Sequence, residues 1–163
     1  MKSHSLFLCL VCSIATLSLA PAHADNLGEM LEKIGLGAII GTWVDADTKG
    51  EAITVTYSWR IENHALALSV KSPNGNSEAL IGVDPKTGDA VHMSLDDRGG
   101  VSRGKWSEDD GVAILNIVRT SVDGEETKIR ITHVIRDNKE LVVGMKNVET
   151  DQGGNVTLVR KPE

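Results

Sequence analysis

The chain has 163 residues, a formal net charge of −6 and only 3% aromatic residues. An acidic chain is a poor partner for nucleic acid or for an anionic bilayer, because binding to either depends on basic patches. The length fits one domain whose core is large enough to be stable without disulfides.

The first 24 residues have the pattern of a secretory signal peptide. Lys2 provides a short basic start, residues 6–19 form an apolar run that is short for a membrane span, and Ala22-His23-Ala24 is a small-x-small cleavage site. We expect cleavage after Ala24 and a periplasmic or secreted protein that has no membrane attachment after cleavage. Both cysteines lie in this segment, so the mature chain would contain neither a disulfide nor a thiol nucleophile.

A short helix is predicted within residues 25–39. Asn26 and Glu29 have the spacing of a capping box, in which each side chain bonds the backbone N–H of the other. Apolar residues then follow at helical intervals, at Leu27, Met30, Leu31 and Ile34. We expect this apolar face to pack against the open end of the domain rather than to bind a partner.

From residue 40 to the end of the chain, the hydrophobic pattern has a period of two. Residues 53–61 are the clearest case, with apolar side chains at every second position. Turn residues such as Asn74-Gly75 and Asp97-Arg98-Gly99-Gly100 separate these segments. The pattern predicts ten strands, at 40–44, 53–61, 65–70, 79–84, 90–96, 101–106, 112–120, 127–136, 140–148 and 156–161.

Ten strands joined by short turns favour an all-β, antiparallel up-and-down barrel over residues 40–163. A flat sheet would leave two exposed edges and an uncovered apolar face, and closure removes the edges. A two-sheet sandwich is the main alternative, but Greek-key sandwiches need long crossover connections, which the pattern lacks. One segment, 112–118, is apolar on both faces, so its register is ambiguous.

Several short motifs give this chain a family resemblance. Gly41-Thr42-Trp43 resembles the opening of lipocalin-type (calycin-type) barrels. Together with residues 81–88, 99–106 and 159–161, it resembles a bacterial family of exported lipocalin-like domains of unknown function, over residues 40–161. The resemblance implies that Trp43 closes one end of the barrel and that a basic residue of the last strand, Arg160 or Lys161, packs across it as a cation on the indole.

Catalytic patterns are missing from the sequence. It has no Gly-x-Ser-x-Gly elbow and no Gly-rich phosphate loop before a helix. Residues 45–56 resemble the start of a calcium loop, but Lys49 and Thr56 stand where ligands are required, so we interpret this segment as a turn. We therefore predict no catalytic residues and no metal site, and we expect a protein that is not an enzyme.

Three histidines remain after cleavage: His64 in a turn, and His92 and His133 in strands. We expect the two strand histidines to be core residues that are satisfied by hydrogen bonds. Zinc binding by this pair is disfavoured, because the two faces differ in polarity and no third ligand is evident. Haem held by His133 alone is an alternative, similar to the ten-stranded barrels of the nitrobindin type, which also begin with Gly-x-Trp.

Three functional hypotheses remain. The first is non-catalytic binding of a small apolar molecule in the barrel lumen. The second is a filled barrel that serves as a structural or protein-interaction module with a basic partner, and the third is single-histidine haem binding. For the first hypothesis, the predicted lining residues are Tyr57, Trp59, Ile131, His133 and Met145.

Overall fold

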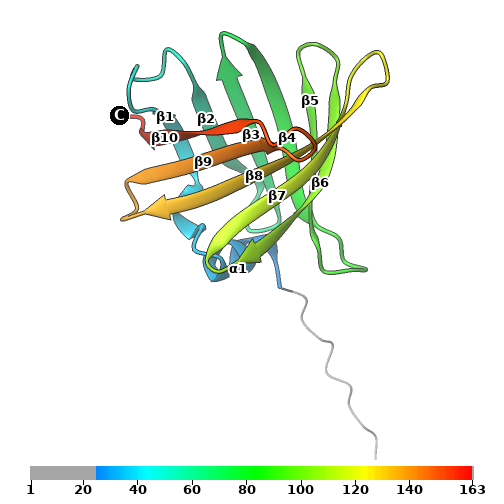
Figure 1. Cartoon of the computed structure of the whole chain (residues 1–163). Helices are drawn as coiled ribbons and strands as arrows, with labels where there is room; N and C mark the ends of the chain where they lie inside the picture. The colour runs from blue at the N-terminus through cyan, green and yellow to red at the C-terminus, as the bar shows by residue number, and fades with distance from the viewer. Residues whose placement is uncertain (1–24, 163) are drawn as a thin grey trace, which may run out of the picture.

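The computed structural model describes residues 25–162, so the predicted signal peptide lies outside the described residues. One short helix precedes ten strands, which form a closed barrel (Figure 1). The predicted all-β, up-and-down architecture is therefore confirmed. The strands are β1 (Gly41–Asp45), β2 (Thr54–Ile61), β3 (Ala65–Ser72), β4 (Gly75–Val83), β5 (Ala90–Asp96), β6 (Val101–Asp109), β7 (Val112–Thr120), β8 (Glu126–Arg136), β9 (Glu140–Asn147) and β10 (Gly153–Arg160).

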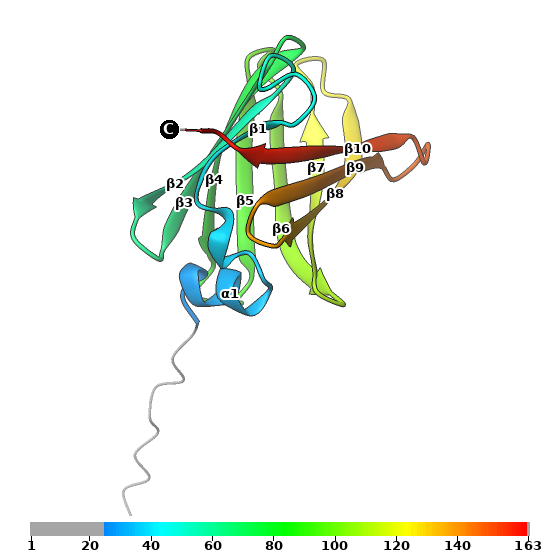
Figure 2. The same cartoon turned by 90° about the vertical axis from the view of Figure 1, so that its left-hand side faces the viewer.

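The first and last strands close the barrel. Each strand pairs antiparallel with its neighbour in sequence, and β1 pairs with both β2 and β10, with Trp43 opposite Arg160. Figure 2 shows β10 lying beside β1. The chain thus has no free sheet edge in the barrel, and the interior is enclosed by every second side chain of each strand.

Helix α1 (Leu27–Lys33) lies below the end of the barrel that we call the base (Figures 1 and 2). Its predicted capping box is present, because Asn26 Oδ1 accepts from the Glu29 backbone N–H at 3.0 Å and Glu29 Oε2 accepts from the Asn26 N–H at 3.2 Å. Leu27 and Leu31 are buried against the barrel core. A 3₁₀ turn, η1 (Gly37–Ile39), then leads into β1; the sequence pattern did not predict it.

The turn between β3 and β4 lies at a slightly different place from the one the sequence predicts. β4 begins at Gly75, four residues before the predicted start, because Ser72 pairs directly with Gly75 and only Pro73 and Asn74 remain in the loop. Gly75 has φ of +138°, a region that other residues rarely adopt. The hairpin thus forms where the Asn-Gly signal predicts it, with its tip one residue earlier.

The segment after β1 is a turn built on the Asp45 carboxylate. Asp45 accepts from the backbone N–H groups of Thr48 at 2.7 Å and Ile53 at 2.8 Å, and also from the Thr48 hydroxyl. These hydrogen bonds, that from the Thr48 side chain foremost, lower the pKa of Asp45 to about 2. The carboxylate is therefore committed to local backbone donors, as expected for a turn.

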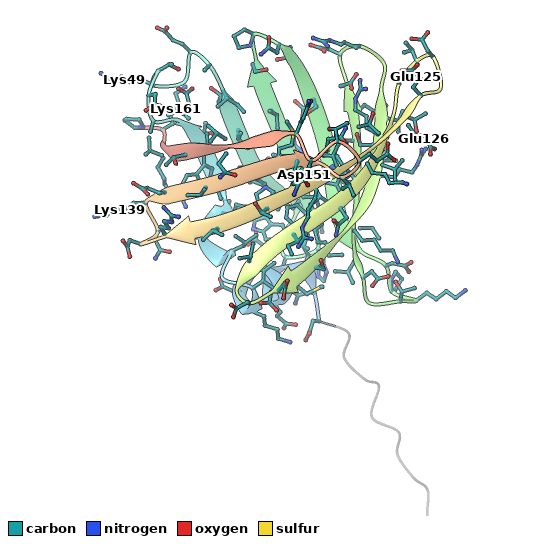
Figure 3. The ribbon with its side chains drawn as sticks, viewed as in Figure 1. Lys49, Glu125, Glu126, Lys139, Asp151 and Lys161 are labelled. Carbon is teal, nitrogen blue, oxygen red and sulfur yellow. The ribbon has the colours of Figure 1, made fainter. Side chains whose placement is uncertain are left out.

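The β7 register is resolved by the structure. Leu115 and Ile117 face the lumen, and Ala113 belongs to the core at the base. Figure 3 shows charged side chains near the ends of strands, such as Lys49 in the turn between β1 and β2 and Lys139 in the turn between β8 and β9. The surface also carries exposed apolar side chains, among them Leu80 and Met93.

Candidate ligand-binding site in the barrel lumen

A cavity of about 500 Å³ lies inside the barrel, away from α1. It opens at the end formed by the β3–β4 and β5–β6 turns, which we call the mouth. Aliphatic side chains from β2, β3, β7, β8 and β9 form most of its wall. They include Val55, Leu68, Leu115, Ile117, Ile131 and Val143.

Small side chains on β4, β5 and β6 leave this space open. Ala79 pairs with Ser94, and Ser94 pairs with Ser102, so three small inward residues stand side by side. Next to them, Gly104 pairs with His92, and a Cβ at position 104 would lie 2.1 Å from the Asn116 carbonyl oxygen. Only glycine fits there, because a side chain at position 104 would overlap the Asn116 backbone and the Ile117 side chain.

Four ring side chains meet at the inner end of the cavity. The His133 ring centroid lies 4.9 Å from that of Trp106 and 6.5 Å from that of Tyr57, and His92 lies 6.5 Å from Trp106. The two histidines and Tyr57 line the cavity. The Trp106 side of the group faces a smaller cavity of about 170 Å³ against α1. We call these four residues the ring cluster.

Three polar atoms of the ring cluster are buried without a hydrogen-bond partner among the described residues. They are Nδ1 of His92, Nδ1 of His133 and Nε1 of Trp106. Buried polar groups are usually paired, and an unpaired one costs about 1–3 kcal/mol. Both strand histidines were predicted to be core residues that are satisfied by hydrogen bonds. The hydrogen-bond part of this prediction is wrong for the two Nδ1 atoms, which have no partner among the described residues.

Burial also determines the charge of the ring cluster. Removal from water lowers the pKa of His92 to about 4 and, with a smaller contribution from repulsion by His92, that of His133 to about 3. The same loss of solvent raises the pKa of the Tyr57 hydroxyl. At neutral pH the inner end of the cavity is therefore uncharged, with two neutral imidazoles that each have one N–H.

The mouth, in contrast, carries paired charges. Asp96 accepts from Arg119 Nε at 2.8 Å, and its carboxylate lies 2.6 Å from Arg119 NH2. Asp96 also accepts from the backbone N–H groups of Arg98 and Gly100, and its pKa is lowered chiefly by Arg119. Asp97 in turn accepts from the Asn76 N–H at 2.8 Å. The mouth is thus a hydrogen-bonded rim above an apolar wall.

The structure places four of the five predicted lining residues at the cavity. Tyr57 and His133 lie in the ring cluster, Ile131 is part of the wall, and Met145 lies at the mouth with 56% of its surface exposed. Trp59 is different, because it packs beside Leu66 against the core at the base and does not line the cavity. β2 runs from the mouth towards the base, so Tyr57 and Trp59 share a face but lie at different depths.

Trp43 and Arg160 lie together at the base. The Trp43 ring is completely buried, and its Nε1 donates to the Ile39 carbonyl at 2.7 Å. The Arg160 guanidinium carbon lies 4.3 Å from the centroid of this ring, and its nitrogens donate to the Ile40 and Ala38 carbonyls. Arg160, rather than Lys161, is the cation that stacks on Trp43.

The sequence analysis missed several residues of the site. Ser94, Ser102 and Arg119 were not singled out, and neither was Trp106 as a neighbour of His133. The period of two carries part of the signal, because Ser94 shares a face with His92, and Ser102 shares one with Trp106. The pairing between distant strands, which brings Trp106 to His133, has no local signal.

The surroundings of His133 do not fit those of an axial haem ligand. An iron-ligating imidazole normally donates its second N–H to a carboxylate, a carbonyl or water, which fixes the ring. His133 Nδ1 has no acceptor among the described residues, and the neighbouring Trp106 indole can only donate. In the described part of the chain, no three His, Cys, Asp or Glu side chains gather as a metal site either.

In comparisons with known proteins, no family model matches the chain, and no curated protein matches it. Within residues 25–162, no helix has the length and apolar character needed to cross a membrane. Any functional inference therefore depends on the lumen itself.

Proposed function

We propose that this protein is a lipocalin-like binding protein, exported by its signal sequence, that holds a small and largely apolar molecule in the barrel lumen. The observation that carries the proposal is the cavity of about 500 Å³ with its largely aliphatic wall. Small-molecule sites are typically concave, mostly apolar and about 300–1,000 Å³ in volume, with a few polar groups that orient the ligand.

The chemistry of the lining supports binding rather than catalysis. A general base of the histidine type needs a group that orients it and a pKa near the working pH. Neither His92 nor His133 forms a hydrogen bond with another described residue, and burial holds the pKa of each well below neutrality. Two carboxylates line the cavity at the mouth, where Asp96 is bonded to Arg119 and Asp97 accepts from the Asn76 backbone N–H.

The volume of the lumen also favours binding over the filled-barrel alternative. In a filled barrel, large inward side chains would occupy the space next to β4 and β5, but Ala79 and Ser94 stand there. If no molecule occupied an open, apolar space of this size, the side chains around it would lack packing contacts.

The proposal is tested with a variant that blocks the lumen and a neighbour that does not. Ala79→Phe places a ring in the cavity, whereas Leu80→Phe changes the next residue on the outer face, which is 50% exposed. Both variants and the wild type are expressed with the leader, recovered from the periplasm and titrated with N-phenyl-1-naphthylamine, a neutral apolar fluorophore.

We expect the wild type and Leu80→Phe to bind the fluorophore with similar affinity, and Ala79→Phe to lose at least tenfold. Native mass spectrometry of the exported wild type should also detect a co-purified molecule that Ala79→Phe lacks. Equal binding by all three proteins would mean that the fluorophore sits elsewhere. No binding by the wild type, together with no co-purified molecule, would refute lumen binding.

A further inference from the structure

The ring cluster lies where the inner end of a bound molecule would be, and it contains the only polar groups at that depth among the residues that line the cavity. We propose that the lumen ligand is an apolar molecule with an uncharged hydrogen-bond acceptor, such as a ketone or ester carbonyl, at its innermost end, and that His133 and His92 donate to it. This inference rests on the proposed function and adds the chemical class of the ligand.

The orientation of the imidazoles is the first argument. In both histidines, Nδ1 is shielded by protein, although the residue lines the cavity. The His133 ring therefore meets the cavity with its other side, which carries Nε2. His92 lines the cavity too, and it also borders an outer groove beside Leu80 and Met93. Unlike Nδ1, the Nε2 atom of each ring is not fully shielded, and it forms no hydrogen bond with another described residue. Both Nε2 atoms are therefore available to a ligand.

The position of the proton is the second argument. A neutral imidazole has one N–H, and its place depends on what faces the other nitrogen. The Trp106 indole, whose nitrogen can only donate, lies tilted at 48° to the His133 ring, with 4.9 Å between the two centroids. His133 Nδ1 has no acceptor among the described residues. A proton at Nδ1 would therefore be left unpaired, whereas a proton at Nε2 can be donated to a ligand.

The lack of charge is the third argument, and it separates a carbonyl from a carboxylate. Burial keeps both imidazoles neutral at pH 7. The two arginines that line the cavity lie at the rim, where Arg119 is bound to Asp96 and Arg98 donates to the Asn74 carbonyl. A carboxylate brought to the ring cluster would therefore lose its hydration without gaining a cation, which is far costlier than burying a carbonyl that accepts a hydrogen bond.

The depth of the cavity indicates the size of the apolar part. His92 and Asp96 lie on the same strand at the two ends of the cavity, four residues apart. At about 3.3 Å per residue, this span is roughly 13 Å. A fused bicyclic ring or a chain of about ten carbons would fill it, with the acceptor at the ring cluster and the other end beneath the mouth.

Three naphthalenes of nearly equal shape test the inference: 2-acetylnaphthalene has a carbonyl, 2-isopropylnaphthalene has none, and 2-naphthoate is charged. Each is titrated against the wild type, and the infrared carbonyl band of bound 2-acetylnaphthalene is recorded. We expect the acetyl compound to bind about tenfold more tightly than the isopropyl compound, the effect of one buried hydrogen bond. Its carbonyl band should shift to lower frequency, and 2-naphthoate should bind most weakly.

Variants assign the effect to the ring cluster. His133→Leu should remove most of the acetyl preference without weakening 2-isopropylnaphthalene, and His133→Gln, which keeps a donor, should retain part of it. Trp106→Phe keeps an aromatic ring beside His133 and offers Nδ1 no acceptor either, so the acetyl preference should remain. His64→Leu, at an exposed turn, is the matched control and should change nothing.

Two results would overturn the inference while leaving lumen binding intact. One is equal binding of the two neutral compounds to the wild type, and the other is a preference that survives in His92→Leu/His133→Leu. Tightest binding of 2-naphthoate would also overturn it, since the site would then select an anion. If neither neutral compound binds while N-phenyl-1-naphthylamine does, this inference alone fails. If none of the three binds and no molecule co-purifies, the proposed function fails with it.

Discussion

The two ends of the barrel use the same strand alternation to opposite effect. At the base, inward positions carry large side chains such as Trp43, Leu66 and Leu158, each 1% exposed or less, and α1 covers them. Towards the mouth, the inward positions of β4 to β6 carry alanine and serine, and a cavity replaces the core. Alternation sets which side chains face inward, and side-chain volume sets whether the interior is packed or open.

This difference predicts that stability resides at the base and binding resides near the mouth. A packed core loses stability when a side chain is truncated, because the cavity left behind adds to the lost burial. A side chain in the wall of an existing cavity already lacks packing contacts on one side. Its truncation therefore removes less burial than truncation in the packed core. The four predictions that follow test this division, from the largest expected effect to the smallest.

Trp43→Ala should have the largest effect on folding. The ring is fully buried, donates to Ile39 and lies under Arg160. Truncation of a buried tryptophan costs about 3–5 kcal/mol, and urea unfolding would measure it. Arg160→Met keeps an unbranched chain over the ring and should cost much less. If Trp43→Ala unfolded at the same urea concentration as the wild type, the base would not be the stabilising end.

Two residues of β9 provide a direct comparison of the ends. Leu141 is fully buried at the base, whereas Val143, two residues along the same strand, lines the cavity. We expect Leu141→Ala to cost about 2–5 kcal/mol in unfolding free energy, and Val143→Ala about 1 kcal/mol. Ligand affinity should respond in the opposite order. Similar stability losses at both sites would contradict the division between a packed base and an open lumen.

The base was more predictable from the sequence than the site. The capping box at Asn26 and Glu29, and the Gly-x-Trp that ends at Trp43, depend on residues close together in the chain, and the structure contains both. The alternation of β2 likewise predicts its inward face. Such signals are local, so a single sequence carries them.

The ring cluster depends instead on pairing between distant strands. His92, Trp106 and His133 come from β5, β6 and β8, and only the register of the intervening β7 brings Trp106 to His133. That register was ambiguous, because residues 112–118 are apolar on both faces. The depth of Trp59 was misjudged for a related reason: alternation gives the face of a residue but not its height in the barrel.

The buried histidines predict how stability changes with pH. Their pKa values in the folded protein, about 4 and about 3, lie below the ordinary value of 6.5. Below pH 6.5 the unfolded chain therefore binds protons that the folded chain does not, and stability falls as the pH is lowered, until the folded pKa is reached. At pH 5 each histidine should cost about 2 kcal/mol relative to pH 8.

Urea unfolding between pH 8 and pH 4.5 measures this loss. His92→Leu/His133→Leu should flatten the profile. The lowered pKa of Asp45 acts in a separate window: its stabilisation is complete above pH 3.8 and is lost as the pH falls towards 2. If the wild-type profile stayed flat down to pH 4.5, the two imidazoles would bind protons as readily in the folded protein as in the unfolded chain.

The rim should contribute least to stability. Asp96 and Arg119 form an ion pair whose side chains are 21% and 31% exposed, and such partly solvated pairs contribute about 1 kcal/mol or less. Arg119→Met should therefore change unfolding by less than about 1 kcal/mol, and that loss should shrink further in 1 M salt. Asp96→Asn should cost more than Arg119→Met, because Asp96 also holds the β5–β6 turn through the N–H groups of Arg98 and Gly100. If the arginine variant were instead the more damaging of the two, the rim would be held by the ion pair across strands, and the mouth would be a structural clamp as much as an entrance.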